Sequence, residues 1–186
     1  MKAKWLGVAL GCAVLAGGAA GCGQGRAIFN VDVYSFLKGT GSDNVSYVVP
    51  PGLSGSAGTT PQKISLPGTG SSIVDSVRAF GNLDLQNATG SGTIGFEIYL
   101  AADSIGTFNA SAKAITVPTK NVSGASTTPD IIQADLTTAF KSLFTKSQVW
   151  IRLVANGSAD PGVTPLQGKA VLTSLQVTVI ISDKIF

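Results

Sequence analysis

The chain has 186 residues, of which 44% are hydrophobic and only 12% are charged, and its formal net charge is +3. This length fits one domain of ordinary size with room for a hydrophobic core. The sequence contains no histidine, which excludes His-dependent catalytic triads, imidazole zinc sites and histidine proton shuttles.

The first 22 residues have the organisation of a secretory signal. Lys2 and Lys4 give a positive start, residues 5–18 form an apolar run, and small residues at 19–21 precede Cys22. The run is shorter than the ~20 residues that span a bilayer, so it predicts a targeting segment and not a membrane helix. Its removal leaves 11 of the 13 basic residues against 10 acidic ones. This balance argues against a surface for nucleic acid or a polybasic membrane patch.

The small residues before Cys22 resemble the signal of bacterial lipoproteins, with Ala19 at the position where leucine is usual. The resemblance covers residues 1–22 only. It implies that residues 1–21 are removed and that the sulfur of Cys22 carries a diacylglycerol, with fatty acyl chains such as palmitate. The alternative is an ordinary secretory signal cut near Ala20, which leaves Cys22 as a free thiol.

The residues after the cysteine predict how the domain is attached. They are rich in glycine and predict a flexible tether over residues 22–27. Gly23 differs from the aspartate that, in enterobacterial lipoproteins, retains the protein at the inner membrane. The resemblance therefore implies delivery to the outer membrane.

The chain then shows the pattern of strands and turns. Aromatic and β-branched residues predict a first strand over residues 28–37. Residues 38–72 are rich in Gly, Ser and Pro and predict a long surface excursion, with edge strands near 46–49 and 63–66. Loops of this length are often functional, which makes the excursion a candidate for binding.

Period-two alternation is clearest over residues 73–86 and 93–100, which flank a Gly-rich stretch at 87–92. This pattern predicts a hairpin. Two shorter strands are expected at residues 105–108 and 113–117.

A single helix is predicted over residues 129–146. Thr128 precedes Pro129 and Asp130, an order that favours a capped helix start, and apolar residues then recur at helical spacing. Alternation over residues 148–155 and 169–182 predicts a closing hairpin.

These elements predict a single domain over residues 28–186. Its expected fold is all-β, an antiparallel β-sandwich that is immunoglobulin-like in general architecture, with the helix near residues 129–146 at one end or edge.

Little in the sequence indicates catalysis. A glycosidase-like pair of carboxyl groups would need Glu97 with Asp84 or Asp103, but these positions fit solvated surface carboxylates better. The sequence predicts no catalytic residue, no metal centre and no cofactor. The one exception kept open is a structural calcium ion at Asp43-Asn44, Asp103 or Asp160, where turn formation is the simpler explanation.

Three side chains are the candidates for ligand binding. Tyr47 lies in the long excursion, and Trp150 and Arg152 stand two positions apart on one face of a predicted strand, where they could stack. The sequence thus predicts a non-enzymatic, lipid-anchored envelope protein with a structural or assembly role, as an accessory subunit of an envelope or surface-layer complex with a protein partner. The alternative is an envelope module that binds a small molecule, glycan or lipid.

Overall fold

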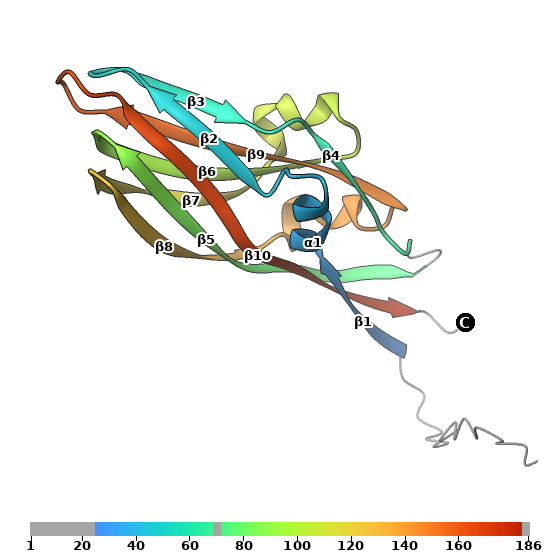
Figure 1. Cartoon of the computed structure of the whole chain (residues 1–186). Coiled ribbons are helices and arrows are strands. Elements are labelled where there is room, and N and C mark those ends of the chain that lie inside the picture. Colours follow the sequence, from blue (N-terminus) through green and yellow to red (C-terminus); the bar gives the residue numbers. More distant parts are fainter. Residues whose placement is uncertain (1–24, 69–71, 184–186) are drawn as a thin grey trace, which may run out of the picture.

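The computed structural model describes residues 25–68 and 72–183, most of which lie in strands (Figure 1). The predicted signal peptide and Cys22 lie outside the described residues. The described strands are β1 (Gly25–Asp32), β2 (Asn44–Val49), β3 (Ser54–Gly58), β4 (Gln62–Ser65), β5 (Ile73–Thr89), β6 (Ser91–Ala101), β7 (Lys113–Ser123), β8 (Ser126–Asp135), β9 (Gln148–Ala159) and β10 (Leu166–Asp183). Short helices join them: α1 (Val33–Gly39), α2 (Thr137–Phe140) and the 3-10 helices η1 (Ile105–Phe108), η2 (Ala110–Ala112) and η3 (Lys141–Leu143).

The strands form two antiparallel sheets packed face to face. The first sheet has the order β1-β10-β5-β8, and β2 pairs with the other part of β10. The second has the order β3-β9-β6-β7, and β4 pairs with the other part of β9. This confirms the predicted all-β antiparallel sandwich. With β1/β2 and β3/β4 each counted as one edge strand, the strand order is that of a jelly roll, which shares the sandwich architecture of the immunoglobulin fold but not its strand order.

The core lies between the sheets and is built from alternate residues of the central strands. The period-two alternation noted at residues 73–86, 93–100 and 148–155 corresponds to one buried face on each of β5, β6 and β9. Their buried apolar side chains are Val77, Ala79, Leu83, Leu85, Ile94, Phe96, Ile98, Leu100, Val149, Ile151, Leu153 and Ala155. Facing them from β10 are Ala170, Leu172, Leu175, Val177, Val179 and Ile181.

Both predicted hairpins are wrong. β5 and β6 belong to different sheets, and so do β9 and β10; β5 pairs instead with β10, and β6 with β9. The Gly-rich links at 90 and 160–165 therefore cross from one sheet to the other. Alternation of apolar and polar residues shows which side of a strand is buried. Two successive strands give the same alternation whether they pair as a hairpin or lie in different sheets, so this pattern does not distinguish the two arrangements.

The predicted helix at 129–146 is also wrong over its first half. Residues up to Asp135 form the edge strand β8, and only the short helices α2 and η3 follow. There Val77 N donates to Thr137 Oγ1 at 2.9 Å, and Leu136 N donates to Val77 O at 2.8 Å. These bonds to β5 end the strand and start the helical turn.

Other boundaries differ in smaller ways. The first strand is shorter than expected, because Asp32 Oδ1 accepts from Ser35 N at 3.1 Å and begins helix α1. β1 begins at Gly25, inside the predicted tether at 22–27. The predicted strand at 105–108 is the 3-10 helix η1, and the predicted excursion at 38–72 supplies α1 and the edge strands β2, β3 and β4.

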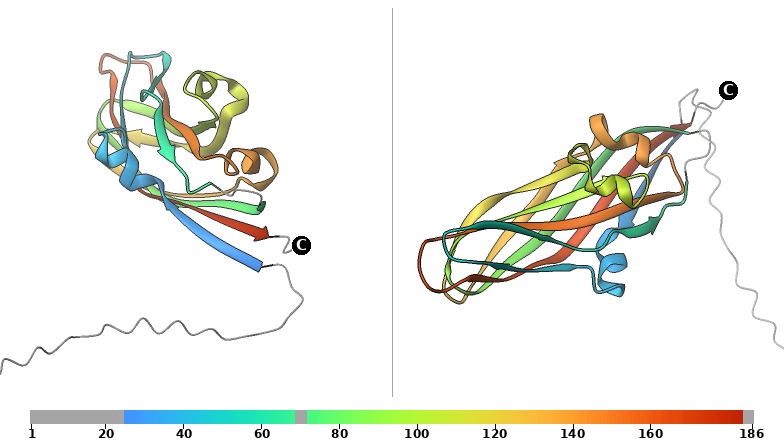
Figure 2. Two further views of the ribbon diagram at one scale, coloured as in Figure 1. Left: turned by 90° about the vertical axis from the view of Figure 1, so that its right-hand side faces the viewer. Right: turned by 90° about the horizontal axis from the view of Figure 1, so that it is seen from above.

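The two ends of the sandwich differ (Figure 2). At one, here called the loop end, lie the sheet-to-sheet links at residues 50–53, 90, 124–125 and 160–165. At the other, called the terminal end, Gly25 pairs with Asp183, and α2 and η3 cover the core. Within residues 25–68 and 72–183, no helix is long and apolar enough to cross a bilayer.

The links at the loop end depend on glycine. Gly90 and Gly124 have φ of +75° and +57°, a region that costs other residues about 1–2 kcal/mol. A Cβ on Gly90 would also stand 2.5 Å from the main-chain oxygen of Pro165, whereas one on Gly124 would meet nothing within 4 Å.

We therefore expect Gly90→Ala to lower the free energy of unfolding clearly more than Gly124→Ala, which should cost only the ~1–2 kcal/mol of backbone strain. Urea denaturation of both variants measures the difference. Equal losses would contradict the close approach of Gly90 to the 160–165 link.

Candidate functional site

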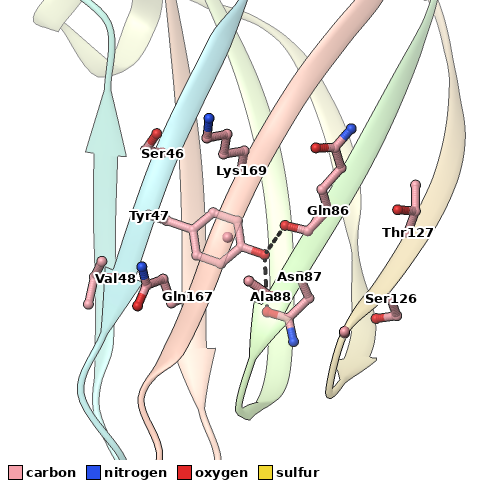
Figure 3. A pocket seen from close by; sticks show the side chains of 12 residues that line it. Ser46, Tyr47, Val48, Gln86, Asn87, Ala88, Ser126, Thr127, Gln167 and Lys169 are labelled. Atoms are coloured by element: carbon pink, nitrogen blue, oxygen red, sulfur yellow. Dashed lines mark hydrogen bonds between the residues drawn. The ribbon is translucent and has the colours of Figure 1, made fainter.

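A polar groove crosses the outer face of the first sheet near the loop end (Figure 3). It is an open depression of about 660 Å³ that spans strands β2, β10, β5 and β8. Hydroxyl and amide side chains are the commonest type among its lining residues, with one cation, Lys169, although apolar atoms form most of its exposed surface. Its polar side chains include Ser46, Gln86, Thr127, Gln167 and Lys169.

Tyr47, one of the predicted ligand-binding residues, lies in the floor of this groove and not on its surface. Its side chain is only 2% exposed. Its hydroxyl lies 3.2 Å from the main-chain oxygen of Gln86 and 3.3 Å from Oδ1 of Asn87. The ring runs past Gly168, where a Cβ would stand 2.5 Å from the hydroxyl oxygen. Tyr47 therefore supports the groove and has no free polar group to offer a ligand.

Asn87 extends this network to the loop end, a role the sequence did not reveal. Its Nδ2 donates to the main-chain oxygens of Gly90 at 3.1 Å and of Gly124 at 2.7 Å. Asn87 stands at the start of a Gly-rich stretch, where a turn residue was the obvious interpretation. The Tyr47–Asn87 pair thus joins the groove to two of the links at the loop end.

Main-chain bonds join all four links. Gly124 N donates to Gly90 O at 2.9 Å, and Asp160 N donates to Ser91 O at 2.9 Å. Gly52 N donates to Asp160 O at 3.1 Å. The loop end is therefore one cross-bonded platform, with a cleft of about 350 Å³ between the links.

Trp150 and Arg152 lie on the other sheet, so the structure does not bring them together with Tyr47. Arg152 stacks with different rings from the one predicted: its guanidinium carbon is 4.6 Å from the Tyr99 ring centre and 4.5 Å from that of Phe108. Its Nε donates to Thr107 O at 3.1 Å. Arg152 thereby fastens the η1–η2 segment to the outer face of β9.

Glu97 lies beside this stack and is held as an anion. Tyr99 Oη donates to its Oε2 at 2.7 Å, and Lys113 Nζ is 2.9 Å from its Oε1. Burial raises the pKa of Glu97, but the hydrogen bonds from Tyr99, Lys113 and Asn156 and the charge of Lys113 outweigh it, so that the pKa lies below its usual value.

The partners considered for Glu97 are not beside it in the sheets. Asp84 is on β5 in the first sheet, and Asp103 Oδ1 accepts from Gly106 N at 2.7 Å to shape the turn before η1. In the described part of the chain, no group of three or more Cys, Asp or Glu side chains could hold a metal ion. Asp43 Oδ1 accepts from the neighbouring Asn44 Nδ2 at 3.2 Å.

Tyr47→Phe should lower the free energy of unfolding by about 1–3 kcal/mol, because it removes the one hydroxyl hydrogen that Asn87 Oδ1 and Gln86 O share. Tyr34→Phe is the control, since the Tyr34 ring faces Lys38 at 5.4 Å and stands in no such network. Denaturation of the two variants measures the effect, and equal small losses would contradict a supporting role for Tyr47.

The same residue predicts a pH dependence. Burial raises the pKa of Tyr47 from 10.0 to about 12, so the folded protein keeps a proton that the unfolded chain loses. This stabilisation is complete below about pH 10 and is lost as the pH rises through about 12. Stability should fall less steeply over this range in Tyr47→Phe than in the unsubstituted protein.

Arg152→Lys keeps the charge but loses the planar stack and the Nε donor. We expect amide hydrogen exchange in η1 and η2 to become about tenfold faster, since tenfold corresponds to a local loss of only ~1.4 kcal/mol. Arg78→Lys, on the outer face of β5, is the matched control and should leave these rates unchanged.

No protein-family model matches the sequence, and no curated protein matches it. Among solved structures, the chain is similar to one in the structure of infectious bursal disease virus Gx strain, with 13% identity, a TM-score of 0.38, and coverage of 87% of this chain and 37% of that one. A chain of the Gt strain gives 14% identity, a TM-score of 0.37, and coverage of 87% and 38%. This chain thus spans less than two fifths of either viral chain, and similarity at this level carries no functional argument.

Proposed function

We propose that this chain is a non-enzymatic, lipid-anchored cell-envelope protein with a structural or assembly role, in which the loop end contacts a protein partner of an envelope or surface-layer complex. The observation that carries the proposal is the position of Cys22. It precedes Gly25, the first residue of β1, by three residues, and β1 begins at the end of the sandwich opposite the loop platform.

This spacing supports attachment close to the membrane. Three residues reach at most ~10 Å, so a diacylglycerol on Cys22 would hold the terminal end near the lipid surface. Strand β5 has 17 residues and runs between the two ends, which separates the loop platform from the anchor by about 50 Å. The resemblance to lipoprotein signals, together with Gly23, supports the outer membrane as the location.

The loop end has properties that suit a protein partner. Val163 is 96% exposed and Leu53 is 57% exposed, and both project from links in the platform. The backbone of Leu53 is already fixed, since its N donates to Pro50 O at 3.1 Å and its O accepts from Ala159 N at 2.9 Å, so this side chain loses little conformational entropy on association. A partner that covers them gains apolar contact at low ordering cost.

The proposal that the protein is not an enzyme rests on the few side chains that could take part in acid–base catalysis. The sequence has no histidine and one glutamate. That glutamate, Glu97, is engaged by Tyr99 and Lys113, and its lowered pKa keeps it ionised at neutral pH, which is unsuited to a general acid.

The experiment combines anchoring with partner capture. Cys22→Ser should release the protein from the membrane fraction, and the mature amino terminus of the unsubstituted protein should have the mass of a diacylglyceryl-modified Cys22. A photo-crosslinking residue at Val163 should then capture one reproducible envelope protein, whereas the same residue at Ile105, which is 80% exposed but outside the platform, should not. An unacylated terminus, or equal capture at both positions, would refute the proposal.

The binding module remains the second candidate, because the groove over Tyr47 is large enough for a small ligand. Its hydroxyl and amide side chains and the Lys169 amine can form hydrogen bonds with a hydroxyl-rich ligand such as a glycan. The same purified protein distinguishes the two: native mass spectrometry that finds a monomer with a retained small molecule, and no crosslinked partner, favours the module.

A further inference from the structure

Three isoleucines gather on the outer face of the first sheet at the terminal end. Ile28 on β1 pairs with Ile180 on β10. Ile73 on β5 pairs with Ser182, two residues further along β10, and Arg26 pairs with the same serine from the other side. Two-residue spacing keeps these side chains on one face of the sheet. Ile28 is 64% exposed, Ile73 is 46% exposed and Ile180 is half-buried.

This group, called the isoleucine patch, departs from the pattern of the rest of the sandwich. The opposite sides of the same strands already face the core through Val31, Val179 and Val74. An antiparallel sheet with one covered face is expected to be polar on the other. At the terminal end, the outer face of the first sheet instead carries three isoleucines, which stand beside the polar residues Arg26, Asp75 and Ser182.

We propose that the isoleucine patch is a membrane-contact surface, which lays the terminal end of the sandwich against the lipid bilayer. The inference rests on the proposed anchor at Cys22. Only residues 23 and 24 separate Cys22 from β1, and Ile28 follows Gly25 by three residues, so acylation brings the patch to the lipid surface.

The size of the patch favours a bilayer over a protein partner. Measured between backbones, the patch is two strand spacings wide and one two-residue repeat long, which is about 10 by 7 Å. This area is far smaller than the ~800 Å² that each partner buries in a stable protein interface. A surface next to a lipid anchor needs little area, because the acyl chains already supply most of the membrane affinity and hold the patch there at high effective concentration.

The charges around the patch are compatible with lipid headgroups. Arg26 Nε lies 3.7 Å from Asp75 Oδ2, and Asp75 Oδ1 accepts from Ser182 Oγ at 2.9 Å. Arg26 therefore offsets the charge of the Asp75 carboxylate, and no uncompensated negative charge in this pair opposes contact with anionic lipids.

The test uses the processed protein in phospholipid vesicles. Ile28→Cys and Ile73→Cys each introduce a thiol for an environment-sensitive fluorophore, and Ile131→Cys is the matched control. Ile131 is 72% exposed on the outer face of the same sheet, on β8, away from the anchor. Because the patch should enter the headgroup region, nitroxide-labelled lipids should quench the fluorophore at positions 28 and 73 at least ~3-fold more strongly than at 131.

The unsubstituted protein separates the two possible failures. Acylated Cys22 has no free thiol, so this protein should not react with the fluorophore. Reaction at Cys22 would overturn the anchor and the membrane contact with it. No reaction, combined with equal quenching at positions 28, 73 and 131, would overturn the membrane contact alone. Fluorescence changes that follow protein density and ignore the nitroxide lipids would assign the patch to a second copy of the chain, which also overturns the proposal.

Discussion

The architecture depends on one constraint: the chain must pass between the two sheets after almost every long strand. The long strands β5 and β6 lie in opposite sheets, as do β7 and β8, and β9 and β10. Packed sheets are about 10 Å apart, so each link has to turn and cross that distance within a few residues. The left-handed glycines at 52, 90 and 124 make these crossings possible. Because the crossings at residues 50–53, 90, 124–125 and 160–165 meet at the loop end, their main chains bond to one another, and Asn87 adds its side chain to two of them.

Strand positions could be predicted from the sequence, together with the face of each strand that points inward, because burial of one face makes apolar and polar residues alternate along the strand. Which strands pair with one another produces no such pattern in the sequence. Ile94 and Leu83 both belong to inward faces, yet they lie in opposite sheets. The bulge in β10 was also invisible: Leu172 pairs with Leu83 and Ser174 with Asn82, so Thr173 is the extra residue, and Leu172, not Val171, faces the core. Gly81 lies next to this bulge, on the neighbouring strand.

The prediction of a helix over residues 129–146 was wrong for a different reason. Ile132, Leu136 and Phe140 are buried and four residues apart, as in a helix, but Ile132 belongs to a strand and the other two to the turn that follows it. Long-range hydrogen bonds to Val77 decide this boundary, and no local pattern contains them. Prediction of the candidate site was limited in the same way, because contacts between residues distant in sequence determine it. Tyr47 was found as an aromatic in a polar segment, but its burial depends on Gly168 and Asn87, which are distant in sequence.

The strand β1 gives the molecule a mechanical axis. β1 is an edge strand whose ladder bonds are made with β10, antiparallel over all eight of its residues. A pull on Gly25 along the strand would load these bonds in shear, together, because ladder bonds lie perpendicular to the strands. The load would then pass into β10, whose 18 residues run on to the links at the loop end. Tension between a membrane and a bound partner would be transmitted along one continuous strand from end to end. The sandwich would therefore resist extension along this direction.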